Sequence, residues 1–390
     1  MNFGAWPLLR GDLASARCGA SAFLDSLSTQ GNCAETNLQN WSSKWTATGD
    51  TLCDLADLNI DKRSFDEATE AWLSALTAFE VARRLVADDD RGRAEISAKV
   101  EAAVERFGLA LGHKAESIRI PCFELEIQAL FLPAGPSHLS GPAVICISSE
   151  EEAGAILLGR LLPVVIGRGM SVLVVSHEDL PNHSRGQSEI LLSWCLDYLS
   201  TRPDIDHTRI AVYGDGLSAV LATDLAAKDR RVAAAVCEAG IWTWTRRSRL
   251  IGWMTSTADE ADADLIAACQ LRSIQRLKCP ILVVAGGRSS VAVSEAIRLH
   301  ADCLVARIDL ELAMPQIIRG SLGEGVDNFV ASDECIFRWL DQKLAKQSGT
   351  LWSLRWKAPK ERGAHTRWQE RSTAPPSGGD RMPPDGRTRN

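Results

Sequence analysis

Six short apolar runs alternate with helical segments, and this alternation constrains the fold more than any other feature of the chain. The runs are Ala143–Ile147, Ser171–Ser176, Arg209–Tyr213, Val232–Cys237, Pro280–Ala285 and Cys303–Leu310. Continuous runs of Val, Ile, Ala and Leu are typical of strands that are buried on both faces. Helices between such strands make βαβ units, so the sequence predicts an α/β fold with a mostly parallel, doubly wound sheet. Two earlier segments, Ile118–Ile120 and Leu125–Phe131, predict an antiparallel hairpin that leads into it.

The regions outside the predicted sheet have different sequence patterns. Residues 1–60 have weak periodicity and many Ser, Thr, Asn and Gly, so we expect an irregular N-terminal region. Residues 61–116 have helical spacing and predict a helical N-terminal domain; two surface helices packed on the main sheet are the alternative. The apolar positions of the two predicted helices are Trp72, Leu76, Phe79 and Val86, and Ile96, Val100, Val104, Phe107 and Leu111. Residues 117–346 form the α/β domain, and residues 347–390, rich in Pro, Gly and Arg, predict a disordered basic tail.

Charge and composition exclude several classes of function. The net charge is −7, and residues 351–390, with nine Lys/Arg against four Asp/Glu, leave about −12 on the rest of the chain, which does not favour nucleic acid. No apolar stretch reaches the roughly 18 residues of a membrane span, and the N-terminus lacks the pattern of a signal peptide. The eleven cysteines form no CxxC pair and no metal-ligand spacing. We therefore expect a cytoplasmic protein without metal or cofactor.

The segment from Tyr198 to Gly240 is the most informative. It predicts a helix, a turn, a buried strand, a tight turn, an Ala-rich helix and another buried strand. The tight turn is Gly214-Asp215-Gly216-Leu217-Ser218. This arrangement resembles the nucleophile elbow of the α/β-hydrolase superfamily, in which G-x-S-x-G lifts a serine out of the sheet. The resemblance implies that Gly216 occupies the place of the nucleophile, and a glycine cannot attack a carbonyl.

Three further positions depart from the superfamily pattern. The resemblance places the acid in the loop Gly286–Ser290, where Ser289 stands instead of a carboxylate, and the histidine near Gly325. The oxyanion loop reads Ser148-Ser149-Glu150-Glu151-Glu152, and carboxylates there would oppose a developing negative charge. Ser218 and Asp215 are the weak candidates for a replacement group, although Ser218 is better explained by packing.

The layout most resembles the dihydroxypseudooxynicotine hydrolase and fermentation-respiration-switch esterase group, which also carries helices before the catalytic domain. The resemblance covers about residues 60–345. For that group it implies hydrolysis of carbon–carbon, ester or acyl bonds without a metal.

The same turn permits a competing interpretation. Gly214, Gly216 and Ala219 satisfy G-x-G-x-x-A after a strand, and Glu238 ends the next strand, as in dinucleotide-binding proteins. Against this, two βα units precede the strand, whereas the fingerprint usually opens its sheet.

Two polar clusters are further candidates. His177, Glu178, Asp179 and His183 follow a strand and could form a polar or metal site, although an exposed polar loop explains them more simply. Three tryptophans and three arginines follow the strand after the elbow and could shape a ligand cavity, although ordinary packing of a lid explains them better. These six residues are Trp242, Trp244, Trp253, Arg246, Arg247 and Arg249.

Three hypotheses about function follow. The first is a catalytically degenerate hydrolase relative that retains at most binding of an unidentified small molecule or protein, a second copy of the chain included. The second is an active hydrolase with an unorthodox site that uses Ser218, Asp215 or the His177–His183 loop. The third is a dinucleotide-binding protein that uses Gly214, Gly216, Ala219 and Glu238.

Overall fold

The structure of the chain is a computed structural model. The structure describes residues 12–29, 35–86, 91–111, 115–122, 125–135, 140–180, 185–238, 276–285, 293–314, 317–319 and 325–345. The predicted tail, residues 347–390, lies outside them, so its disorder stays a prediction.

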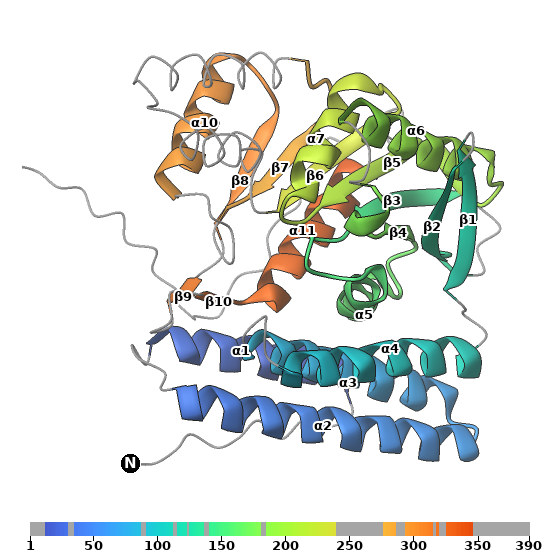
Figure 1. The fold of residues 1–390 in the computed structure, drawn as a ribbon, viewed down its shortest axis with the longest axis vertical. Helices are drawn as coiled ribbons and strands as arrows, with labels where there is room; N and C mark the ends of the chain where they lie inside the picture. The colour runs from blue at the N-terminus through green and yellow to red at the C-terminus, as the bar shows by residue number, and fades with distance from the viewer. Residues whose placement is uncertain are drawn as a thin grey trace, which may run out of the picture. The chain divides into compact units, whose positions relative to one another are not determined.

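An eight-stranded sheet is the centre of the fold (Figure 1). Its strands are β1 (Glu116–Cys122), β2 (Leu125–Leu132), β3 (Gly141–Ile147), β4 (Ser171–Val175), β5 (Ile205–Gly214), β6 (Val232–Glu238), β7 (Ile281–Val284) and β8 (Leu310–Ala313). Their order across the sheet is β1-β2-β4-β3-β5-β6-β7-β8. The pairs β1–β2 and β2–β4 are antiparallel and all the others are parallel, which confirms the predicted fold class and lead-in hairpin.

One predicted strand is wrong. The run Cys303–Leu310 is not a strand, because the helix α10 (Val293–Val305) includes its first three residues and β8 begins only at Leu310. Leu299 and Cys303 are four residues apart and both buried, so the apolar run is the last turn of an amphipathic helix. A turn with Arg307 at a φ of 56° separates that helix from β8. A short pair, β9 (Ile317–Arg319) and β10 (Gly325–Asp327), follows outside the main sheet.

Helices cover both faces of the sheet, so consecutive strand residues enter two different cores. On one face, Val144 and Cys146 pack with α5 (Gly154–Val165) and α11 (Phe329–Lys343). On the other, Ile145 and Ile147 pack with α6 (Arg185–Thr201), α7 (Ser218–Lys228) and α10. Burial on both faces explains why the strands are continuously apolar.

Four helices precede the sheet: α1 (Leu13–Thr29), α2 (Glu35–Asp61), α3 (Phe65–Arg84) and α4 (Arg91–Leu111). The expectation of an irregular region over residues 1–60 is therefore wrong, since α1 and α2 occupy most of it. The buried face of α1 includes Ala16 and Ala20, and such small residues give a weak apolar pattern. Helix α3 packs against α1, α2, α4 and α5 (Figure 1). The four helices thus share one core with α5, while the predicted domain boundary at residue 116 stays a prediction.

Candidate functional site

The turn between β5 and α7 has the strand–turn–helix geometry that the motif predicts. Gly216 lies at its tip with a φ of +59°, in the left-handed region that disfavours other residues. A Cβ atom at Gly214 would lie 2.3 Å from the backbone oxygen of Ser218, so only glycine fits where the strand meets the helix. The sharp turn that presents a nucleophile in hydrolases is present here, and its tip carries no side chain.

A carboxylate lies against this tip. The backbone N–H of Leu217 donates a hydrogen bond of 3.0 Å to Oε2 of Glu150, which comes from the loop after β3. A Cβ atom at Gly216 would lie 2.8 Å from the same Oε2 and 3.3 Å from Cβ of Ser149. In hydrolases the N–H of the residue after the nucleophile helps to hold the oxyanion. In this chain that N–H already binds an internal anion.

Ser218 is the first residue of α7 and is fully buried. Its hydroxyl donates to the backbone oxygen of Ser148 at 2.7 Å, and its Oγ lies 2.6 Å from Nδ1 of His177. A hydroxyl has one proton, and the carbonyl can only accept. Because that proton points to Ser148, Nδ1 of His177 must carry a proton and donate to Oγ, so it is not a base in this arrangement. The structure brings together a serine and a histidine that the sequence analysis treated as separate candidates.

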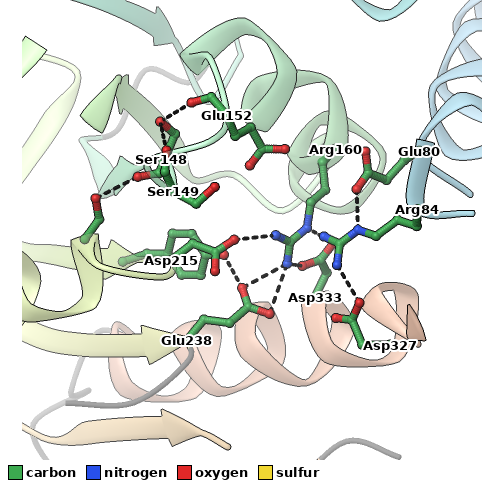
Figure 2. Close-up of polar contacts among 12 residues, drawn as sticks. Glu80, Arg84, Ser148, Ser149, Glu152, Arg160, Asp215, Glu238, Asp327 and Asp333 are labelled. Carbon is green, nitrogen blue, oxygen red and sulfur yellow. Dashed lines mark hydrogen bonds and ion pairs between the residues drawn. The ribbon is translucent and has the colours of Figure 1, made fainter. Parts of the chain in front are cut away.

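Asp215 turns to the opposite side, toward a buried arginine (Figure 2). Arg160 of α5 donates to Asp215 at 3.1 Å, to Glu238 at 2.9 Å and to Asp333 of α11 at 2.5 Å. The side chains of Arg160 and Asp333 are fully buried. Tyr213 also donates to Glu238. One guanidinium therefore holds three carboxylates beneath the turn, and bidentate, charge-assisted contacts of this kind fix geometry strongly.

Burial changes the protonation of these acids. Loss of water and the neighbouring Glu238 raise the pKa of Asp215 to about 8, against the attraction of Arg160. Burial likewise raises the pKa of Asp333 to about 6, although Arg160 opposes the shift. The pKa of Arg160 is well above its usual range, because its carboxylate partners outweigh its own burial. The cluster therefore holds a permanent cation and one acid, Asp215, that retains its proton near neutral pH.

A second group of ion pairs joins α3 to the same region. Glu80 accepts from Arg83 at 2.8 Å and from Arg84 at 2.6 Å. Arg83 also donates to Glu152 at 2.5 Å, and Arg84 donates to Asp327 of β10 at 2.5 Å. All five side chains are nearly fully buried. The helical segment before the sheet thereby fixes the loop after β3 and the strand β10.

Some of the other candidate site residues from the sequence lie in the part of the chain that the structure describes, and the rest lie outside it. Gly325 begins β10, where it pairs with Arg319. Glu178 and Asp179 are exposed, and the three-residue 3₁₀ helix that holds them, His177–Asp179, contains no buried residue. Glu238 and Asp215 are both engaged by Arg160. The others lie outside the described residues: Ser289, His183, Trp242, Trp244, Trp253, Arg246, Arg247 and Arg249.

The buried ion network escaped the sequence analysis, although one signal for it was present. Arg160 is the only charged residue in the twelve-residue segment GAILLGRLLPVV that forms α5. A lone charge in an apolar helix needs a buried partner, because an unpaired buried charge is very costly. No comparable signal identifies Asp333 as a partner of Arg160 or Asp327 as a partner of Arg84, since the paired residues are 173 and 243 positions apart in the chain.

Neither a metal site nor a membrane span is found in the part of the chain that the structure describes. There, no three His, Cys, Asp or Glu side chains lie close enough together to hold a metal ion. None of the helices in the same part combines the length and hydropathy that a membrane crossing requires.

The fold is similar to solved structures of hydrolases. The 2,6-dihydroxy-pseudo-oxynicotine hydrolase is 18% identical with a TM-score of 0.53, and the match covers 85% of this chain and 95% of that one. Est1E from Butyrivibrio proteoclasticus is 12% identical with a TM-score of 0.45, covering 59% and 99% of the two chains. A Mycobacterium tuberculosis puromycin-hydrolyzing peptidase is 15% identical with a TM-score of 0.47, covering 59% and 39%.

Comparison of the sequence with known proteins does not assign the chain to a family. No family model matches the chain, and no curated protein matches it. The sheet order, the β5–α7 turn and the structural similarity together confirm the resemblance: this chain has the fold of the α/β-hydrolase superfamily, with a helical segment before its sheet.

Proposed function

We propose that this protein is a catalytically degenerate α/β-hydrolase relative that binds a small molecule or a protein and does not hydrolyse it. The observation that carries the proposal is at the turn tip. Gly216 supplies no nucleophile, and the adjacent amide of Leu217 is bonded to Glu150. Acyl transfer needs an attacking oxygen and donors for the oxyanion, and this turn supplies neither.

The surroundings of the turn support the same proposal. Asp215 and Glu238 lie at the ends of β5 and β6, where open α/β sheets usually bind ligands. Both are engaged by Arg160. The carboxylate of Glu150, which is bonded to the Leu217 amide, lies where a transition state would develop its negative charge. Electrostatic stabilisation of an oxyanion is usually a large part of hydrolase catalysis, and here it would be reversed in sign.

The proposal includes a cellular location, the cytoplasm. Nine cysteines of the described residues are free thiols, and seven of them are buried. Buried free cysteines behave as small apolar residues, which suits a reducing compartment such as the cytoplasm.

A serine-directed probe tests the proposal. The wild-type protein, incubated with a fluorophosphonate and with a panel of activated esters, should show neither covalent labelling nor turnover above the protein-free rate. The Gly216→Ser variant should also give no useful turnover, because its Cβ atom would lie 2.8 Å from Oε2 of Glu150 and its positive φ disfavours a side chain, so the new hydroxyl would not be held in a productive position. An active α/β-hydrolase is the positive control. Turnover by Gly216→Ser alone would contradict the proposal.

One contact favours a second candidate function, an active hydrolase with a displaced site. Ser218 and His177 lie 2.6 Å apart, which is the distance of a nucleophile and its base. Activity would require Ser218 to release Ser148, to exchange its proton with Nδ1 and to become accessible. Fluorophosphonate labelling that is lost in Ser218→Ala and in His177→Gln would establish this function, whereas labelling that survives Ser218→Ala would not.

A further inference from the structure

A pocket of about 740 Å³ lies where α1, α11 and the end of α5 meet. Helix α1 packs against α11, and α11 packs against α5 (Figure 1). One face of α1 leaves room for the pocket, because Ala14, Cys18 and Ala22 follow one another at a spacing of four residues and have small side chains. Pockets of roughly 300–1,000 Å³ are typical of small-molecule sites. This pocket therefore has the size that a small molecule requires.

Polar contacts hold the walls of the pocket in place. Nδ2 of Asn328, which precedes α11, donates to Asp25 of α1 at 2.8 Å. Arg168, which follows α5, donates to two carboxylates of α11, Glu334 at 2.8 Å and Asp341 at 2.6 Å. The carboxylates that line the pocket among the described residues, Asp25 and Glu334, are thus both engaged. The pocket is preformed, as small-molecule sites usually are.

Arg17 of α1 also lines the pocket, and no carboxylate of the described residues forms an ion pair with it. Its Nη2 donates a hydrogen bond of 3.5 Å to the backbone oxygen of Val330, while its Nη1 is buried and has no hydrogen-bond partner. Burial lowers the pKa of Arg17 below its usual range, although Asp333 and Glu334 oppose the shift. A guanidinium nevertheless stays charged in proteins, and a buried donor without an acceptor costs free energy. A bound anion would offset both the unpaired charge and the unused donor.

Much of the remaining lining is apolar. Leu13, Pro163, Val164 and Ile166 all contribute to it. Ile166 is exposed, so a ligand with an apolar body would gain free energy by covering it. An inorganic anion would use only the cation, and a neutral alcohol would use only the apolar wall. A carboxylate with an aliphatic chain would use both.

We propose that this pocket binds an aliphatic carboxylate, whose charged group pairs with Arg17 and whose chain lies against Val164 and Ile166. Charge-assisted hydrogen bonds to a guanidinium are stronger than neutral ones, so the charge sets the preference for an acid. The inference rests on the proposed function, because it names a ligand class for a protein that binds and does not hydrolyse. No residue of the β5–α7 turn is among the described residues that line the pocket, so the two proposals can fail separately.

Alkylation of Cys18 tests the pocket. Cys18 is exposed and lines it, whereas Cys335 of α11 is exposed and does not, so Cys335 is the internal control. The full-length protein is treated with iodoacetamide in the presence of sodium hexanoate, 1-hexanol or sodium acetate, at constant ionic strength. The rate of alkylation at each cysteine is measured by mass spectrometry of peptides. 1-Hexanol keeps the chain without the charge, and acetate keeps the charge without the chain.

In the wild type, hexanoate should slow the alkylation of Cys18 in a saturable way and leave Cys335 unchanged. 1-Hexanol and acetate should need concentrations at least about tenfold higher for the same effect. In Arg17→Met, hexanoate should lose its advantage over 1-hexanol. Arg91→Met is the matched control, since it removes an arginine of α4 whose side chain is 92% exposed and which does not line the pocket, and it should behave as the wild type.

Three results would overturn the pocket: no protection of Cys18 by hexanoate, equal protection by 1-hexanol in the wild type, or unchanged protection in Arg17→Met. An unchanged rate at Cys335 shows that Arg17→Met is folded. If that variant does not fold, the comparison of hexanoate with 1-hexanol in the wild type still tests the role of the charge. Covalent labelling by a fluorophosphonate would instead contradict the proposed function, so the two failures are distinguishable.

Discussion

Arg160 carries a positive charge where water does not reach, and three carboxylates depend on it. Its side chain and that of Asp333 are fully buried, while Asp215 and Glu238 retain small exposed fractions. Removal of water from charges is costly, and the cost is offset only while every partner is present. The network therefore fixes the end of β5, the end of β6 and α11 relative to α5.

Arg160→Met should destabilise the fold by about 3–5 kcal/mol, because Asp333 would be left buried without a counter-charge. Urea unfolding followed by circular dichroism measures this change. Arg338→Met, on an exposed arginine of α11 with a side-chain exposure of 65%, is the matched control. Its effect should be within about 0.5 kcal/mol. Equal losses in the two variants would show that the network is not what holds these elements.

The raised pKa of Asp215 has a direct consequence for stability. In the folded protein its pKa is about 8, against an ordinary value of 3.8. Between these values the folded state retains a proton that the unfolded chain has lost, so this group makes stability fall as pH rises from about 4 to about 8. Asp215→Asn removes that dependence. Its free energy of unfolding, relative to the wild type, should therefore rise steadily between pH 5 and pH 8.

Asp206→Asn is the control for this pH dependence. A hydrogen bond from Thr208 is the main cause that lowers the pKa of Asp206 to about 2, with Arg209 helping. Both the folded and the unfolded pKa of this group then lie below pH 5. The difference between Asp206→Asn and the wild type should be constant from pH 5 to pH 8, and a constant difference for Asp215→Asn as well would contradict the raised pKa.

At the scale of elements, the close contact between α5 and α4 depends on one residue without a side chain. A Cβ atom at Gly159 of α5 would lie 2.5 Å from Cγ1 of Val100 and 3.3 Å from Cγ2 of Val104, both in α4. It would also lie 3.5 Å from Leu76 of α3. The helices before the sheet therefore approach α5 more closely than an alanine would permit.

Gly159→Ala should destabilise the protein by about 1–3 kcal/mol through overpacking, although alanine is the better helix former. Val100→Ala, made in the same background, should relieve the overlap. A double-mutant cycle from chemical unfolding should then give a favourable coupling of at least about 1 kcal/mol between the two positions. Strict additivity would show that α4 moves away from α5 at little cost.

At the scale of the molecule, the described helices before the sheet and the sheet itself share one core. Leu76 and Phe79 of α3 belong to the same buried cluster as Val144 of β3 and Phe337 of α11. The described residues up to 345 belong to one compact unit. A shared core of this kind predicts that the helices and the sheet unfold together.

Leu76→Ala should cost about 2–5 kcal/mol, as for other large buried side chains. Hydrogen exchange followed by mass spectrometry should show the same loss of protection in peptides from α3 as in peptides from β3 and β5. The helical segment and the sheet would both exchange through global unfolding. Faster exchange in α3 alone would mean that the helical segment opens as a separate unit.

The sequence by itself determined the class of the fold and the glycine at the tip of its β5–α7 turn. Strands such as Ala143–Ile147 can be predicted from the sequence because burial on both faces makes every position apolar, and this pattern does not depend on which strand is the neighbour. The glycines of the β5–α7 turn are readable because backbone geometry demands them locally. The absence of a side chain at Gly216 follows from the same local reasoning.

Only the tertiary structure decided which charged and polar groups meet. The contacts of Arg160 with Asp333, of Arg84 with Asp327 and of Ser218 with His177 join segments that are far apart in the chain. The local sequence around a charged residue does not indicate its partner, because the pairing energy arises only where the fold brings the two charged groups together and excludes water from them. Glu150 is a further example. The resemblance assigned it to the oxyanion loop, but only the folded structure shows that its carboxylate accepts a hydrogen bond from the Leu217 amide.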